Sequence, residues 1–108
     1  MGVIESAKKL SDKCDSLIKS ILRQTTLAHV TNPLDYAWEY HLSYLSQYSG
    51  LGAKTLLLGM NPGPYGMAQC GVPFGATHIA RDFLNISGEV KDPVGRHPKR
   101  PVVGLDFE

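Results

Sequence analysis

The most informative stretch of the sequence is LLLGMNPGPYGMAQCGVPFG, residues 56–75. It begins with an apolar run, Leu56 to Leu58, that lacks alternating polar residues and so predicts a parallel strand covered on both faces. A loop rich in glycine and proline follows, with the polar side chain of Asn61 at the exit of the predicted strand. Open α/β sheets place binding groups at this end of their strands. We therefore predict an α/β fold with its site in this loop.

The loop differs from phosphate-binding loops of similar composition. Pro62, Pro64 and Pro73 have no N–H, which reduces the number of backbone donors that could hold a phosphate. The spacings GxGxxG and GxxxxGK[ST] do not occur between Gly59 and Gly75, and no lysine follows the glycines. We do not expect a nucleotide cofactor. The loop instead offers one amide, open glycine backbone, a thioether and an aromatic ring. These groups suit a flat, neutral, hydrogen-bonding ligand such as a nucleobase.

Two helices are predicted ahead of the loop. Apolar residues recur at three-to-four spacing through residues 4–22, as on one face of an amphipathic helix. A second helix is expected to start at Asn32, because asparagine caps helices and Pro33 suits the first helical position. It is expected to end at Ser49 and Gly50. Its tyrosine stripe and Trp38 are predicted to be core, as are three histidines without ligand spacing: His29, His41 and His78.

The predicted strand, residues 54–60, has few possible partners. Residues 76–86 suggest a short helix and residues 101–105 a second strand, with a polar stretch between them. Because one strand cannot make a parallel sheet, either further strands are missing or another chain supplies them. We expect the isolated chain to be at best marginally stable, and a sharp cooperative melt of the monomer would count against this.

The composition is that of an ordinary globular chain, with 43% hydrophobic and 19% charged residues. Its net charge of +1 excludes a globally basic nucleic-acid binder, so any DNA contact must be local. No apolar run reaches membrane length, and the N-terminal helical pattern carries lysines and acids, unlike a signal peptide. We expect no membrane contact and a location in the cytosol or nucleus. Cys14 and Cys70 give neither a disulfide framework nor metal spacing, and are expected to be reduced.

Residues 59–75 closely resemble the first active-site motif of the single-strand-selective monofunctional uracil-DNA glycosylases, within the uracil-DNA glycosylase superfamily. Two flanking stretches agree with the same family, NPLDYAWE at residues 32–39 and HPKRPVVGL at residues 97–105. The resemblance covers roughly two thirds of the chain. Tyr65 stands where we expect Phe, Cys70 where we expect Thr, and Thr77-His78 replaces an acidic or aliphatic pair.

The resemblance implies the N-terminal part of a three-layer α/β/α fold with a parallel sheet that is incomplete here. Enzymes of this family are longer and carry a second motif, beginning His-Pro-Ser-Pro, which does not occur in these 108 residues. Residues 1–108 are therefore expected to form a single partial glycosylase domain, the front half of such an enzyme. We expect this chain alone to be inactive or nearly so, because the missing histidine is a leading donor to the departing base.

The resemblance also implies the roles of individual residues. Asn61 is the catalytic residue: its amide cannot take up a proton at neutral pH, so it positions water for hydrolysis of the N-glycosidic bond. The base-binding residues are Met60, Gly63, Met67 and Phe74, with Phe74 stacking on the flipped base. Without the resemblance, Asn61 reads as a turn residue and Phe74 as a core aromatic. No metal or other cofactor is expected.

A basic cluster near the C-terminus is the one local candidate for DNA contact. The resemblance favours His97, Lys99 and Arg100 as DNA-binding residues. The alternative is that these residues belong to a solvated surface loop that does not contact DNA. The expected partner is DNA containing uracil or related modified pyrimidines, single-stranded or duplex, in base-excision repair in the nucleus, with the protein a monomer. A second hypothesis remains open: a catalytically inactive shortened form that at most binds DNA or a protein.

Overall fold

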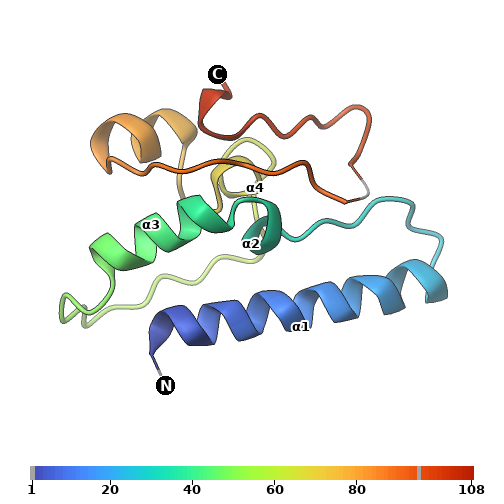
Figure 1. Cartoon of the computed structure of the whole chain (residues 1–108), viewed down its shortest axis with the longest axis horizontal. Coiled ribbons are helices and arrows are strands. Elements are labelled where there is room, and N and C mark those ends of the chain that lie inside the picture. Colours follow the sequence, from blue (N-terminus) through green and yellow to red (C-terminus); the bar gives the residue numbers. More distant parts are fainter. Residues whose placement is uncertain (1, 95) are drawn as a thin grey trace.

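Helices provide the regular secondary structure of the computed structural model, which describes residues 2–94 and 96–108. The middle of the molecule is formed by two helices of the central sequence, with the long N-terminal helix on one side and the C-terminal third of the chain on the other (Figure 1). The elements in chain order are α1 (Val3–Gln24), α2 (Pro33–Tyr36), α3 (Trp38–Tyr48), α4 (Met67–Cys70), a π-helical turn (Ile79–Phe83) and a 3-10 turn (Gly104–Asp106).

The predicted parallel sheet is absent from the residues that the structure describes, so the α/β prediction is wrong for this chain. The apolar run at residues 56–58 lies in an irregular segment without strand pairing. The side chains of Leu56 and Leu58 are 85% and 88% exposed. A strand is stable only when a neighbour takes up its backbone N–H and C=O groups and its faces are covered. No described segment provides these contacts, so the run faces solvent.

The second predicted strand, residues 101–105, is also wrong. Residues 101–103 are irregular and the chain then enters the turn Gly104–Asp106, closed by a hydrogen bond from the Phe107 N–H to the Gly104 carbonyl (3.2 Å). Gly104 has φ +68°, and a Cβ there would lie 2.9 Å from the Tyr40 hydroxyl oxygen. The tight contact with α3 bends the chain away from an extended course. The helix predicted at residues 76–86 is confirmed in its central part as the π-helical turn.

The helix predicted from the N-terminal apolar pattern is confirmed as α1, and its apolar face is only partly covered, with Ala7, Cys14 and Ile18 half-buried. Leu10 and Leu17 are more than half exposed, and the buried residue of α1 is Ser11. The Asn32 amide nitrogen donates to the Ser11 carbonyl and hydroxyl oxygens and to the Asp15 carboxylate, each at 3.1 Å. A buried polar cluster therefore fixes α1 to the start of α2.

The single helix predicted from Asn32 onward is two helices that meet at Ala37. Asn32 caps α2 as predicted, since its side-chain oxygen accepts the Leu34 N–H at 3.1 Å. The Tyr36 carbonyl accepts the Lys91 N–H (2.9 Å) from outside the helix, and Ala37 leaves helical geometry with φ −106° and ψ 26°. Ala37 is fully buried, and its carbonyl oxygen lies 2.9 Å from where a Cβ of Gly71 would be. Tertiary contacts thus interrupt the helix.

The core lies where α2 and α3 meet the second half of the motif and the C-terminal segment. His41 belongs to it, as predicted, but His29 and His78 are exposed, which corrects two of the three histidine predictions. Cys70 is buried and Cys14 half-buried, and both are free thiols. The apolar members of the core cluster are Tyr36, Ala37, Tyr40, Cys70, Val72, Ala80, Ile86 and Leu105.

Candidate functional site

A cavity of about 720 Å³ lies along the glycine- and proline-rich motif, and we call it the motif pocket. It is lined by residues 57–63, 65–67 and 73–76, so that two separate parts of the motif face each other across it. The five residues assigned to catalysis and base binding all lie in this lining: Met60, Asn61, Gly63, Met67 and Phe74. The structure brings these residues together, and their chemical roles stay predictions.

The motif pocket is electrically neutral. Among the described residues that line it there is no Asp, Glu, Lys, Arg or His, and its polar side chains are those of Asn61 and Tyr65. Asn61 is exposed, and its amide nitrogen donates to the neighbouring Pro62 carbonyl at 3.3 Å. A wall of leucine, methionine, proline and aromatic groups with one amide suits a flat ligand that forms few, specific hydrogen bonds. It does not suit a charged ligand.

Phe74 lies at the edge of the motif pocket in a strained turn. The Gly75 N–H donates to the Val72 carbonyl (2.9 Å), with Pro73 and Phe74 as the central residues. Phe74 has φ +56°, a conformation usually left to glycine at this turn position, and its ring remains 71% exposed. The ring extends over Gly59, where an added Cβ would lie 3.4 Å from its Cζ atom. Local strain of this kind is common in ligand-binding loops, and here it belongs to a residue whose ring lines the cavity.

The second half of the motif is held by a close approach between two glycines. A Cβ on Gly66 would lie 2.8 Å from the Gly75 carbonyl oxygen, a distance that real side chains do not reach. The helical turn of α4 begins directly after Gly66 and ends at Gly71, which has φ +67°. Absence of side chains at these points lets the motif fold back on itself, which closes one side of the motif pocket.

Three buried side chains to which the sequence analysis assigned no role in the site anchor this half of the motif. The Tyr36 hydroxyl donates to the Ala68 carbonyl, and the His41 Nδ1–H donates to the Gly71 carbonyl at 2.8 Å. The Gln69 amide nitrogen donates to the carbonyls of Pro64 (3.1 Å) and Pro101 (2.9 Å), and its oxygen accepts the Val103 N–H at 2.8 Å. The sequence did contain a signal for Gln69, because it is the one amide side chain in residues 66–75.

Burial sets the protonation state of these anchors. It raises the pKa of Tyr36 to about 12, against a smaller opposing hydrogen bond, so the phenol keeps the proton that it donates. Burial lowers the pKa of His41, which therefore stays neutral, and its bond to a carbonyl places the proton on Nδ1. Burial also raises the pKa of the Cys70 thiol. The three anchoring side chains are therefore neutral groups that hydrogen-bond to the backbone, and none of them supplies a charge to the site.

A second cavity of about 490 Å³ adjoins the motif pocket, and we call it the basic pocket. It is lined by residues 29, 31 and 36, by residues 62, 64, 65, 68 and 69, and by residues 93, 96, 97, 99–102 and 107. Pro62 and Tyr65 line both cavities. The predicted DNA-binding residues His97, Lys99 and Arg100 all lie here and not in the motif pocket.

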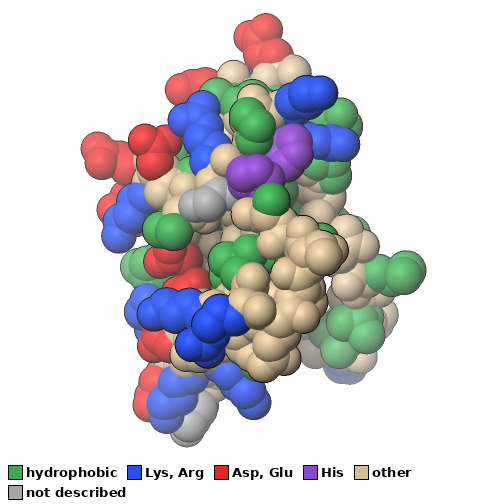
Figure 2. Space-filling view, turned by 90° about the vertical axis from the view of Figure 1, so that its right-hand side faces the viewer, with side chains coloured by type: hydrophobic (Ala, Val, Ile, Leu, Met, Phe, Trp, Pro, Cys, Tyr) green, Lys and Arg blue, Asp and Glu red, His purple; other side chains and the backbone are tan. Residues whose placement is uncertain are grey.

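One face of the molecule carries neighbouring histidine side chains. Figure 2 shows Lys and Arg side chains on both sides of them, with Asp and Glu side chains toward one edge of the same face. The rings of His29 and His97 meet edge to face, with centroids 4.9 Å apart. Within the described chain, no group of three or more His, Cys, Asp or Glu residues is placed to hold a metal ion. Nor does any described helix combine the length and apolar character needed to cross a bilayer.

No family model matches the chain, but comparison with known proteins gives similar relatives. A protein of Bos taurus named single-strand selective monofunctional uracil DNA glycosylase is 46% identical over 105 residues, which are 97% of this chain and 37% of that protein. Proteins of the same name from Rattus norvegicus and Mus musculus are 54% and 53% identical over 77 residues, 71% of this chain and 28% of each relative.

These matches confirm the resemblance that the motif predicts. They also define its extent, because the chain spans between 28% and 37% of the length of these relatives. The match concerns part of a glycosylase, as expected from the missing second motif.

Proposed function

We propose that this chain represents part of a monofunctional uracil-DNA glycosylase, which hydrolyses the N-glycosidic bond between uracil and deoxyribose during base-excision repair in the nucleus. One observation carries the proposal: the five residues that the resemblance assigns to base binding and catalysis surround one neutral cavity. The relatives' names support the reaction class. We extend the proposal to related modified pyrimidines and to duplex as well as single-stranded DNA.

In the proposed reaction, the target base leaves the stack and enters the motif pocket. Phe74 offers an aromatic face to the base, Met60 and Met67 line the cavity with apolar surface, and Gly63 leaves its backbone open to the ligand. Single-stranded DNA lowers the cost of unstacking, which amounts to about a few kcal/mol in a duplex. Asn61 holds the attacking water by hydrogen bonding, since its amide does not act as a base at neutral pH.

The neutral lining also favours the second candidate function for this chain by itself. A departing uracil anion needs preorganised donors or positive charge, and loss of one such donor typically costs about 10²–10³ in rate. Among the described lining residues, Asn61 and Tyr65 are the only side chains able to donate a hydrogen bond. The alternative is therefore a catalytically inactive form that at most binds DNA or a protein.

Uracil release from a single-stranded uracil-containing oligonucleotide tests both candidates. The chain is compared with Asn61→Ala and with Gln24→Ala, an amide removed from an exposed position on α1 outside both cavities. Release by the chain and by Gln24→Ala, but not by Asn61→Ala, supports the enzyme. No release from any of the three, with retained affinity for the oligonucleotide, supports the inactive binding form.

A further inference from the structure

The basic pocket takes no part in the hydrolysis proposed for the motif pocket, yet its size and lining are those of a ligand site. Its volume of about 490 Å³ falls within the range typical of small-ligand sites, about 300–1,000 Å³. Its lining combines three cationic side chains, from Arg96, Lys99 and Arg100, with aromatic and histidine rings. A ligand that fits this combination carries both a negative charge and a flat ring.

The charges of the basic pocket favour an anion. None of the described residues that line it is Asp or Glu. Arg96 pairs with Asp92 at 3.4 Å, whereas Lys99 and Arg100 form no ion pair within the described chain. The His97 Nδ1 atom accepts the Lys99 N–H at 3.0 Å, so in the neutral ring the proton lies on Nε2 and can be donated to a ligand. These groups suit a phosphate.

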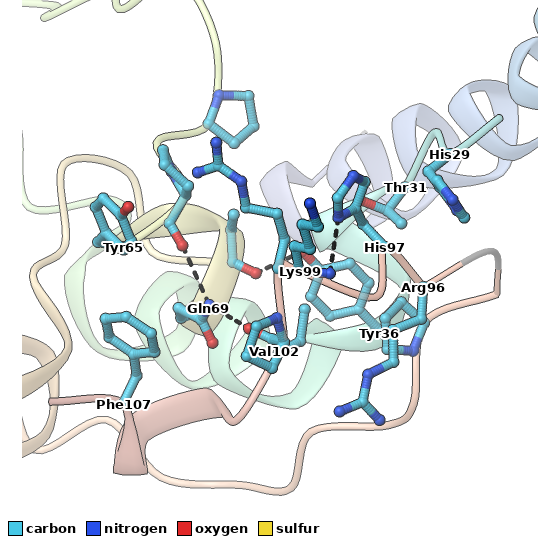
Figure 3. Close-up of a pocket in the computed structure, with 16 residues that line it drawn as sticks. His29, Thr31, Tyr36, Tyr65, Gln69, Arg96, His97, Lys99, Val102 and Phe107 are labelled. Atoms are coloured by element: carbon cyan, nitrogen blue, oxygen red, sulfur yellow. Dashed lines mark hydrogen bonds between the residues drawn. The ribbon is translucent and has the colours of Figure 1, made fainter. Parts of the chain in front are cut away.

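The other end of the basic pocket is aromatic. Figure 3 shows Tyr65 and Phe107 at one end, His29 and Arg96 at the opposite end, and Lys99 and His97 between them. The Tyr65 and Phe107 rings are stacked, with centroids 5.6 Å apart and planes 26° apart, and Tyr65 is 64% exposed. A nucleobase stacked on such a ring contributes about 1–3 kcal/mol in single-strand binding proteins. A phosphate alone leaves this end of the cavity empty.

The position of the basic pocket relates it to the target base. Pro62 and Tyr65 form a wall shared with the motif pocket, so a strand that delivers one base to the motif pocket passes the mouth of the basic pocket with its next nucleotide. We propose that the basic pocket binds the nucleotide adjacent to the target in a single strand, its phosphate at Lys99 and Arg100 and its base at Tyr65. This inference rests on the proposed function, which supplies the target base in the motif pocket.

Binding of a DNA strand that contains no uracil tests the inference separately from hydrolysis. The probe is a nine-residue thymidine strand with one central tetrahydrofuran abasic residue, and fluorescence anisotropy gives its affinity for the full chain. Lys99→Ala with Arg100→Ala is expected to weaken binding about tenfold, since charge-assisted contacts to phosphate are lost. The slope of log affinity against log salt is expected to fall by about 0.7 for one lost contact to a single strand.

A matched control separates this site from general attraction to positive charge. Lys54→Ala with Lys91→Ala removes the same charge from exposed positions outside both cavities. It is expected to weaken binding less than threefold. An equal loss in both double variants, or no measurable binding by the unmodified chain, overturns the inference, whatever the result for uracil release.

Neutral linkages in the probe locate the phosphate. Replacing the one phosphodiester next to the abasic residue by a methylphosphonate is expected to weaken binding to the unmodified chain about tenfold and to have almost no further effect on Lys99→Ala with Arg100→Ala. Independent effects of the two changes overturn the assignment.

Competition distinguishes a nucleotide from a bare anion. Thymidine 3′,5′-bisphosphate is expected to displace the probe at a concentration at least tenfold below that of inorganic phosphate. Displacement by both at equal concentration shows a phosphate site only, and overturns the nucleotide inference.

Discussion

Residues 56–63 and residues 66–75 belong to one sequence motif, yet their backbones are held in different ways. The second half has carbonyls bound by buried side chains. Its Gly71 lies against Ala37, between α2 and α3, and its Gly66 lies against Gly75. The first half runs past the motif pocket with Leu58 at 88% exposure and Met60 fully exposed. The motif therefore consists of an anchored wall carrying Met67 and Phe74 and an open wall carrying Asn61.

The residues that line one cavity can therefore be held with unequal rigidity. Catalysis requires groups to be held close to their productive geometry, and a shift of about 1 Å can cost about 10²-fold in rate. Buried contacts fix the backbone of the anchored wall at Ala68 and Gly71. Asn61 lies on the wall that lacks such contacts within the described residues, which agrees with the proposal that this chain by itself has little activity.

The largest expected effect comes from breaking the anchored wall at Gly71. Gly71→Ala forces a side chain into a left-handed conformation and against the Ala37 carbonyl, so we expect a loss of about 2–4 kcal/mol in the free energy of unfolding. Gly50→Ala is the control, because Gly50 has φ +74° with nothing within 4 Å. It is expected to cost about 1 kcal/mol in the same urea titration. Equal losses would show that the contact with Ala37 is unimportant.

Removal of the Gln69 amide is expected to separate the motif from the C-terminal segment. Gln69→Leu leaves the Pro64 and Pro101 carbonyls and the Val103 N–H without their partner, at a cost of about 2–3 kcal/mol. Hydrogen exchange of the Val103 amide is expected to accelerate accordingly. Gln47→Leu, an exposed amide, serves as the control and is expected to change stability by less than about 0.5 kcal/mol.

Acidification is expected to weaken the anchored wall through His41. Burial lowers the pKa of His41 in the folded chain below its unfolded value of about 6.5. Between these two pKa values, His41 is protonated in the unfolded chain and neutral in the folded chain. Stability is therefore highest above pH of about 6.5 and falls as the pH drops toward the folded pKa, by about 1.4 kcal/mol for each unit of difference. Melting temperatures measured from pH 7.5 to 5 check this.

The matched variant for this titration is His41→Gln, which keeps a donor for the Gly71 carbonyl but does not titrate. Its melting temperature is expected to depend less on pH than that of the unmodified chain. The exposed His29 and His78 are present in both proteins, so the difference between the two curves reports His41. Parallel curves would assign the acid sensitivity to another group.

The smallest expected effect lies in the open wall. Leu57→Ser replaces a side chain that is 73% exposed, so the free energy of unfolding is expected to change by less than about 0.5 kcal/mol. Val72→Ala, in the anchored wall and 1% exposed, is expected to cost about 2 kcal/mol. If Leu57→Ser costs as much as Val72→Ala, the apolar run is covered in solution and the two walls do not differ.

Local sequence patterns correctly predicted α1, the start of α2 and five residues that line the motif pocket. The 3.6-residue period predicted α1, and Asn32 with Pro33 predicted the start of α2, because capping and periodicity depend on neighbours in the chain. The motif, read through its resemblance, named five residues that the fold then placed around one cavity. Local geometry and composition were sufficient for these predictions.

The way in which these elements are held depends on tertiary contacts. The apolar run at residues 56–58 has the composition of a buried strand, but burial requires partners that the described residues do not supply. The break at Ala37, the anchors Tyr36, His41 and Gln69, and the wall shared by the two cavities all depend on contacts across about 30 residues or more. Such contacts are set by packing in three dimensions, which no local pattern records.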